Sequence, residues 1–214
     1  MPKDLNQLTV HGFLEELASA RPVPGGGTVA ALAGALAAAL TTMVARLTLA
    51  REKFQDRHAL MASIEDRAQQ RLLTLQALLQ QDTDAYQAVV ESLRLPKSTD
   101  EEKAHRTTTI QEALRQAASV PLKTLAALDE LMDDAAQTLR SGNPIAASDA
   151  GAAVQLIRAA ASIAAYNVWI NLQSVRDETF RIDAKKKVRV ALERIESCAA
   201  RSHEALQRAL VHNV

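Results

Sequence analysis

Three consecutive glycines are the first residues of the sequence whose type and spacing could do chemistry. Gly25, Gly26 and Gly27 precede Thr28 and a segment made almost only of Ala, Leu, Val and Gly. Backbone N–H groups at such a helix start, together with the helix dipole, can hold an anion or a carbonyl oxygen. Alternatively, the glycines only permit a sharp entry turn and close packing. The residues alone leave both interpretations open.

Carboxylates supply two further candidate sites. In SDAG, Ser148 and Asp149 stand where a helix is expected to begin, so either could be an ordinary N-cap, and a carboxylate there is stabilised as the anion. In DTDAY, Asp82 and Asp84 are two residues apart. On a helix they point about 200° from each other, so they do not form a paired-carboxylate site.

Two asparagines follow Asp149 on the same expected helix. Asn167 lies 18 residues after Asp149, which is about 27 Å along a helix, so the two side chains of one chain cannot meet at one carbon. Asn167 and Asn171 are one turn apart, and we expect them to pack and form hydrogen bonds in the core.

The elements that must position these residues are all expected to be helices. Aromatic residues are only 3% of the chain, and alternating β-branched runs are absent, so strands have little support. Thr99 and Glu102 form a capping box at one helix start, and Pro121 is expected to kink or split that helix. The sequence predicts one all-α domain, 1–214, a bundle of about six helices. The expected helices begin near Thr9 and after Gly27 (to about Ala50), cover 58–93, run from Thr99 to near Gly142, and cover 148–172 and 179–211.

The helix after the glycines has two different apolar faces. One face carries large side chains: Leu32, Leu36, Leu40, Met43 and Leu47. The opposite face carries small ones: Ala30, Gly34, Thr41, Ala45 and Thr48. We expect this helix to be buried on both sides in a tightly packed Ala/Gly-rich core, with a dimer interface as one possible neighbour.

Composition argues against several classes of partner. The 25 basic and 25 acidic residues cancel, so no net field attracts nucleic acid or an anionic membrane. The apolar run 29–40 is shorter than the roughly 20 residues that span a bilayer. The single Cys198 and the lack of a signal-peptide pattern predict a cytoplasmic protein. Neither a zinc pattern nor a nucleotide loop is present, so we expect no metal and no nucleotide cofactor.

Several blocks in series carry a family resemblance. PVPGGGTVAALAGALAAAL resembles the signature of the cyclodeaminase/cyclohydrolase family, which acts on one-carbon tetrahydrofolates. DTDAYQAVV and LPKSTDEEKAHR are similar to its middle section, AASVPL to its proline-containing helix, and GNPIAASDAGAAVQLIRAAASIAAYNVWINL to its second signature. The likeness covers about 13–172 and implies an all-helical, dimeric fold. It also implies one of two activities: cyclisation of 5-formiminotetrahydrofolate to 5,10-methenyltetrahydrofolate with loss of ammonia, or hydration of the methenyl compound to 10-formyltetrahydrofolate.

The resemblance assigns roles to the candidate residues. It makes Asp149 the leading catalytic or pterin-binding candidate and Asp82 the second, with Asp84 an ordinary surface charge. The substrate-binding candidates are Gly25, Gly26, Gly27, Thr28, Asn143 and Ser148. For the acidic tail of a folate the chemistry of carboxylate binding adds Arg51, Lys53 and Lys97, each of which is alternatively an ordinary solvated surface charge.

One segment departs from the family pattern. Where the family commonly reads TxGKKKY, this chain has TLAREKF, so Glu52 reverses a charge and Phe54 lacks a hydroxyl. A non-catalytic helical module that binds folate or a protein partner is therefore a rival hypothesis, and a purely structural dimer is another. Turnover of methenyltetrahydrofolate would discriminate between them and the enzyme.

Overall fold

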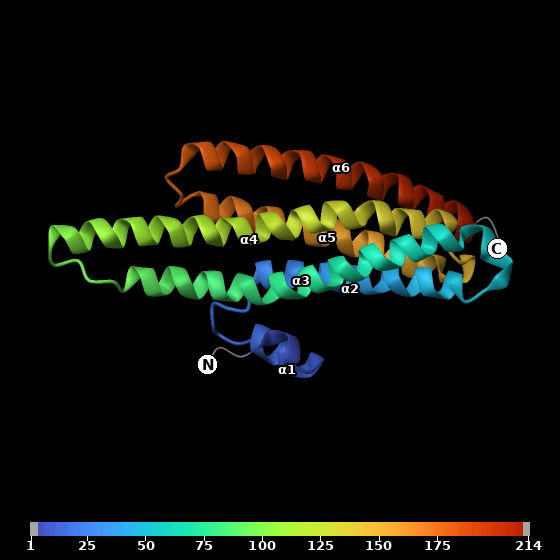
Figure 1. Cartoon of the computed structure of the whole chain (residues 1–214), viewed down its shortest axis with the longest axis horizontal. Helices are drawn as coiled ribbons and strands as arrows, with labels where there is room; N and C mark the ends of the chain where they lie inside the picture. Colours follow the sequence, from blue (N-terminus) through green and yellow to red (C-terminus); the bar gives the residue numbers. More distant parts are fainter. Residues whose placement is uncertain (1–3, 212–214) are drawn as a thin grey trace.

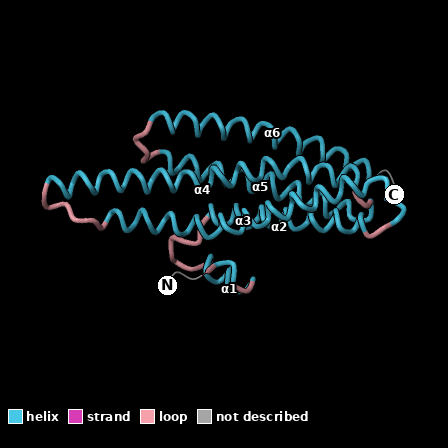
Figure 2. Tube along the Cα trace, viewed as in Figure 1, coloured by secondary structure: helices cyan, strands magenta, loops and turns pink. Residues whose placement is uncertain are grey.

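The computed structural model describes residues 4–211, and every regular element in this part of the chain is a helix (Figures 1 and 2). Four long helices form a bundle in which each packs against the next around a ring, and a fifth long helix lies along two of them. The helices are α1 (Val10–Leu17), α2 (Gly26–Leu49), α3 (His58–Leu93), α4 (Asp100–Ser141), α5 (Ala147–Leu172) and α6 (Glu178–Val211). The ring is α2–α3–α4–α5, and α6 covers α4 and α5 (Figure 1). The prediction of an all-α fold with about six helices is confirmed.

Local capping signals place several helix ends. Thr9 caps α1 by accepting from the Gly12 N–H at 3.0 Å. Thr99 and Glu102 form the predicted capping box of α4, which stabilises the otherwise unpaired N–H groups of its first turn. The expected cap of α5 was wrong, because neither Ser148 nor Asp149 occupies that position. The chain enters α5 through a short 3-10 helix, η3 (Pro144–Ala146), whose N-cap is Asn143.

Pro121 lies inside α4 without splitting it, since α4 is one helix of 42 residues. A proline lacks the N–H that would bond the carbonyl four residues earlier, here Ala117. The Asn171 side chain of α5 donates to that carbonyl at 2.9 Å instead. The expectation that Asn171 forms a core hydrogen bond is therefore confirmed, and the bond replaces the one that Pro121 removes.

The two faces of α2 have different environments. The small face is buried against α3, α4 and α5, and a side chain at Gly34 would come within 2.7 Å of Leu128 Cδ2. The large face is not buried: Leu36 and Met43 are exposed, and Leu40 is only partly covered. Within one chain α2 is therefore buried on its small face only, because small side chains let the helices approach closely and the bulky ones point outward. Burial of the large face against a second subunit stays a prediction.

Length and composition alone do not separate α2 from a membrane span. Gly26–Leu49 and Pro144–Leu172 are both long and apolar enough to cross a bilayer. The argument from the short run 29–40 is therefore insufficient. In the structure α2 packs against α3, α4 and α5, and 61% of its apolar stretch is buried inside the protein. The absence of a membrane partner stays a prediction.

Candidate active site

The first turn of α2 meets a carboxylate from α3. Thr28 Oγ1 donates to Asp82 Oδ2 at 2.8 Å, across 54 residues of sequence. A side chain at Gly27 would overlap the Asp82 carboxylate, so the glycine allows this approach. On the other side of the turn, a side chain at Gly26 would lie 3.1 Å from Asn167 Nδ2 of α5. The structure therefore brings together the predicted glycines, Thr28 and Asp82, with Asn167 beside them.

Burial of Asp82 changes its acidity. Loss of solvent raises the pKa of the Asp82 carboxyl above its usual value, while hydrogen bonds from the Thr28 hydroxyl and backbone N–H lower it less. A raised pKa makes the carboxylate a better proton acceptor and moves its titration toward the pH range in which general acid–base catalysis is most effective. Asp84 is exposed and accepts from Gln80 Nε2 at 2.9 Å, as expected for a surface charge.

The glycine turn serves packing and leaves backbone accessible at the same time. Gly27 is buried under Asp82, whereas Gly26 is exposed. The carboxylate nearest the α2 start is therefore the protein's own, and a ligand would approach from the open side of Gly26. Close packing and ligand access therefore do not exclude each other. Gly27 is needed for the packing of Asp82, and Gly26 leaves its backbone accessible.

Helices α3 and α5 continue past the first residue of α2, so their side chains there are less covered. The face of α3 that carries Leu75, Leu78 and Asp82 is largely covered, but Tyr86, one turn beyond Asp82 on the same face, is 39% exposed. On α5, Ile170 follows Asn167 by almost one turn and is 59% exposed. Both side chains lie past the first residue of α2, so no α2 neighbour covers them. Sequence reasoning missed Tyr86 and Ile170, because their exposure depends on where α2 begins.

A second group of predicted residues lies at the other end of α2. The Asn143 N–H donates to Thr48 Oγ1 at 2.9 Å, and Asn143 Nδ2 donates to Leu47 O at 3.4 Å. Thr48 follows Thr28 by 20 residues, which is about 30 Å along the helix. Asn143 is buried, and its Oδ1 accepts from the Ile145 N–H at 3.1 Å. Its polar groups thus hold the chain turn that leads into α5.

Asp149 and Ser148 belong to this second end as well. Both lie in the first turn of α5, beside Ala146 and Ala150, which pack on Val44 of α2. Asn167, at the first end, is 18 residues further along α5, about 27 Å away. One chain therefore does not bring Asp82 and Asp149 to one reacting carbon.

The predicted cations are also distant from Asp82. Arg51 and Lys53 follow the end of α2 and are exposed, and the structure shows no ion pair for either among the described residues. Lys97 is exposed in the α3–α4 connection, at the left end of the molecule in Figure 1. Phe54, which replaces the family's tyrosine, is buried at 8% exposure, with Lys53 Nζ 4.9 Å from its ring centroid. The ring therefore packs into the protein, and its face makes a cation–π contact with the lysine.

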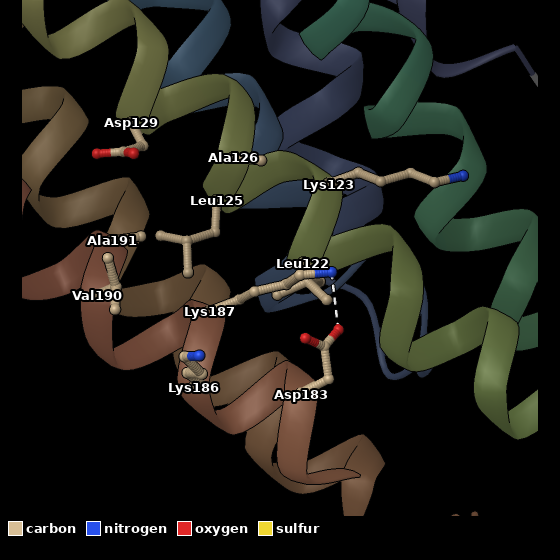
Figure 3. Close-up of a pocket in the computed structure, with 10 residues that line it drawn as sticks. All are labelled: Leu122, Lys123, Leu125, Ala126, Asp129, Asp183, Lys186, Lys187, Val190 and Ala191. Carbon is tan, nitrogen blue, oxygen red and sulfur yellow. Dashed lines mark ion pairs between the residues drawn. The ribbon is translucent and has the colours of Figure 1, made fainter. Parts of the chain in front are cut away.

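A cavity of about 640 Å³ lies elsewhere, between α4 and α6 (Figure 3). Apolar side chains such as Leu122, Leu125 and Val190 line it, and Lys187 pairs with Asp183 at 2.7 Å across its edge. None of the site residues predicted from the sequence borders this cavity. It is separate from the residues around Asp82.

Metal ligation finds no support in the arrangement of the side chains. Among the described residues, no three His, Cys, Asp or Glu side chains come together as a metal site would require. His212 lies outside the described residues. That the protein works without a metal remains a prediction.

Comparisons with known proteins agree with this helical arrangement. A family model described as formiminotransferase-cyclodeaminase matches residues 9–190. A methenyltetrahydrofolate cyclohydrolase of Methylorubrum extorquens is 38% identical over 180 residues, covering 84% of this chain and 86% of the relative. A formimidoyltransferase-cyclodeaminase of Mus musculus is 31% identical over 198 residues. That match covers 92% of this chain, which spans only 37% of the mouse protein.

A solved structure has the same fold along nearly the whole chain. The crystal structure of formiminotetrahydrofolate cyclodeaminase from Thermotoga maritima matches with a TM-score of 0.85 at 30% identity, covering 95% of this chain and 98% of that one. The glycine turn, Asp82 and both asparagines of α5 all lie inside the region that the family model matches. The chain belongs to the formiminotransferase-cyclodeaminase family.

Proposed function

We propose that the protein is a one-carbon tetrahydrofolate enzyme whose reaction takes place at the start of α2. It either hydrates 5,10-methenyltetrahydrofolate to 10-formyltetrahydrofolate or forms the methenyl compound from 5-formiminotetrahydrofolate with release of ammonia. The observation that carries the proposal is the Asp82 carboxyl, partly buried against Gly27 and bonded to Thr28. The family match and the names of the relatives support the substrate class.

The chemistry requires a carboxyl group of this kind. Both reactions pass through a tetrahedral carbon flanked by N5 and N10 of the folate. In the hydration, an ionised Asp82 stabilises the delocalised methenyl cation and takes a proton from the attacking water; the bond from the tetrahedral carbon to N5 then breaks, N5 takes a proton, and the formyl group stays on N10. In the deamination, a protonated Asp82 gives its proton to the departing ammonia. Burial raises the pKa of Asp82, which favours the protonated form that the deamination needs, while the hydration uses the ionised form.

Substrate and assembly follow from the same proposal. The tetrahydrofolate derivative is the substrate, and the proposed hydration needs neither metal nor nucleotide, because the carbon under attack is already cationic. We further propose a cytoplasmic homodimer that binds neither nucleic acid nor membrane, which agrees with the balanced charge of 25 basic and 25 acidic residues.

Two relatives are named for different reactions, one for the hydration and one for the deamination. The Methylorubrum protein, of similar length, is a methenyltetrahydrofolate cyclohydrolase, and the Thermotoga structure is a formiminotetrahydrofolate cyclodeaminase. The test is to add the purified protein to each folate. Loss of methenyltetrahydrofolate absorbance identifies the hydrolase, whereas a gain of that absorbance from 5-formiminotetrahydrofolate with ammonia release identifies the deaminase. If neither folate turns over but folate raises the melting temperature, the protein is a binding module instead.

Asp149 remains a candidate at the other end of α2, and its role is tested by direct comparison. We expect Asp82→Asn to lower turnover more than Asp149→Asn, because the Asp82 carboxyl lies at the open glycine turn. Both substitutions keep the size of the side chain, so the two variants should fold alike. A greater loss in the Asp149→Asn variant would place the reaction at the other end of α2.

A further inference from the structure

The α4–α6 groove, the cavity of about 640 Å³ between these two helices, exists because small side chains face each other there (Figure 3). Helices α4 and α6 run in the same direction (Figure 1). Asp129 of α4 bonds to Arg194 of α6, which is 65 residues later. The same spacing sets Ala126 opposite Ala191, and both line the groove. Two alanines at one helix contact leave a space that larger side chains would fill.

Ion pairs close the groove at both ends. Arg194 pairs with Asp129 at 2.7 Å at one end, and Lys187 pairs with Asp183 at 2.7 Å at the other. The distance along α4 from Leu122 to Asp129 is about 10 Å. Small-molecule sites occupy about 300–1,000 Å³, so the volume of the groove suits a small ligand.

The surface between these ends is apolar. Leu125 forms the floor and is only 1% exposed, while Val190 is 49% exposed and stands on the α6 side. Leu122 is partly covered and continues the apolar lining. An apolar group that enters the groove would leave water, which favours binding by about 25 cal/mol for each Å² buried.

The charges that are left over around the groove are positive. Its two acidic residues, Asp129 and Asp183, are neutralised by the ion pairs at the ends. Lys123 and Lys186 also border the groove and are exposed, and neither forms an ion pair within the part of the chain that the structure describes. An anion could therefore be bound here without breaking an existing pair.

Both lysines belong to the same end of the groove. Lys123 follows Leu122, and Lys186 precedes Lys187, which the spacing of 65 residues sets opposite Leu122. In Figure 3 the Lys123 side chain extends away from α6, and its flexible four-carbon stem allows it to turn toward a bound anion. The groove thus has positive charge at one end and apolar surface beyond it.

We propose that the α4–α6 groove binds a small organic anion with an apolar body, of the class of medium-chain carboxylic acids. The apolar chain lies between Ala126 and Ala191, and the carboxylate contacts Lys186 and Lys123. A groove about 10 Å long and closed at both ends fits such a molecule better than a helix of a partner protein, which is itself about 10–12 Å wide. The proposal does not depend on the reaction at Asp82, because the groove is separate from that site.

Calorimetric titration with three ten-carbon probes tests the class of ligand. Decanoate is the proposed type, decanol has the same chain without the charge, and decyltrimethylammonium carries the opposite charge. Each probe is kept below the concentration at which it aggregates. We expect decanoate to bind saturably, decanol to bind roughly three- to tenfold more weakly because it lacks the charge-assisted contact, and the cation not to bind measurably. No binding of decanoate, or equal binding of decanoate and the cation, overturns the proposal.

Substitution at the helix contact tests the location. Ala126→Phe fills the groove, so decanoate should bind at least about tenfold more weakly. The matched control is Ala104→Phe, also exposed on α4 but outside the groove, which should bind as the wild type does. Both alanines are exposed, so both variants should fold. Equal binding of decanoate by the two variants overturns the location.

Substitution of the lysines tests the recognition of the carboxylate. The double variant Lys123→Gln with Lys186→Gln should bind decanoate about as weakly as the wild type binds decanol. Lys185→Gln is the control, because Lys185 is exposed and lies next to Lys186 but does not border the groove. Equal affinity of the double variant and the control would mean that neither lysine holds the carboxylate, and the proposal would be wrong.

Folate turnover separates this proposal from the proposed function. The groove variants should keep wild-type turnover, since none of them changes a residue around Asp82. A wild-type protein that turns over neither folate contradicts the proposed function, while the titrations still report on the groove. If decanoate does not bind but an acidic amphipathic helical peptide does, the groove receives a partner helix and the small-anion proposal is wrong.

Discussion

The Asp82 carboxylate occupies the space into which a side chain at Gly27 would project. The two residues are 55 positions apart in the sequence, on α2 and α3. Their contact lets the Thr28 hydroxyl and backbone N–H reach the same carboxylate. Gly27 is therefore required because a side chain at this position would collide with the carboxylate of Asp82.

Gly27→Ala should displace Asp82. The added methyl group would overlap its carboxylate, and we expect a loss of about 1–3 kcal/mol in the free energy of unfolding, as for other overpacked sites. Turnover should fall too, because the carboxylate moves. Gly25→Ala is the control, since its methyl group would meet only Pro22 O, at 3.4 Å. Urea unfolding and folate turnover of both variants check this, and equal behaviour of the two would contradict it.

Asp82→Asn should remove catalysis while leaving the fold intact. An amide cannot accept the proton of attacking water or donate one to ammonia as a carboxyl does, so we expect kcat to fall on the order of 10²–10⁴-fold. Asp84→Asn is the matched control two residues away, exposed and bonded only to Gln80, and it should keep its turnover. Similar kcat values for the two variants would remove Asp82 from the reaction.

The pKa of Asp82 predicts how stability depends on pH. Burial raises this pKa in the folded state above the unfolded value of about 3.9. Between these two values the folded chain holds more protons than the unfolded chain, so stability falls as pH rises through this window. The Asp82→Asn variant lacks this titration. Its free energy of unfolding should therefore increase relative to that of the wild type as pH rises, and near neutral pH it should be at least as large. Urea unfolding of both proteins at several pH values measures the difference.

The opposite outcome of that experiment has a clear meaning. If the wild type gains on the variant as pH rises, the Thr28 bonds and the helix dipole stabilise the carboxylate by more than its burial costs. The direction of the pKa shift would then be reversed, and folding would favour the ionised form of Asp82.

Helix positions were predictable from the sequence because their signals are local. The capping box at Thr99, the N-cap at Thr9 and the end of α4 before Gly142 are each read from a few neighbouring residues. The outward face of α2 was not predictable in this way. A helical period separates Leu36 and Met43 from Gly34 and Ala45, but it does not tell which face meets the rest of the bundle.

The candidate site was predictable only in part, for a similar reason. The glycines and Asp82 were both chosen from the sequence, and the structure brings them together. Asp149 was chosen as well, but its place at the far end of α2 depends on the direction in which α5 runs past α2. Asn167 was read as a core residue, and only the packing of α5 shows that it stands beside Gly26.

The Asn171 bond to Ala117 gives the sharpest test of the fold. Asn171→Ala leaves the Ala117 carbonyl without its donor, because Pro121 offers no N–H, and should cost about 1–3 kcal/mol in the free energy of unfolding. Pro121→Ala restores a helical N–H to that carbonyl. In the Pro121→Ala background, Asn171→Ala should therefore cost clearly less, with a coupling of about 0.5–3 kcal/mol by double-mutant cycle. Chemical unfolding of the four proteins gives the cycle, and strictly additive losses would mean that Asn171 acts through packing alone.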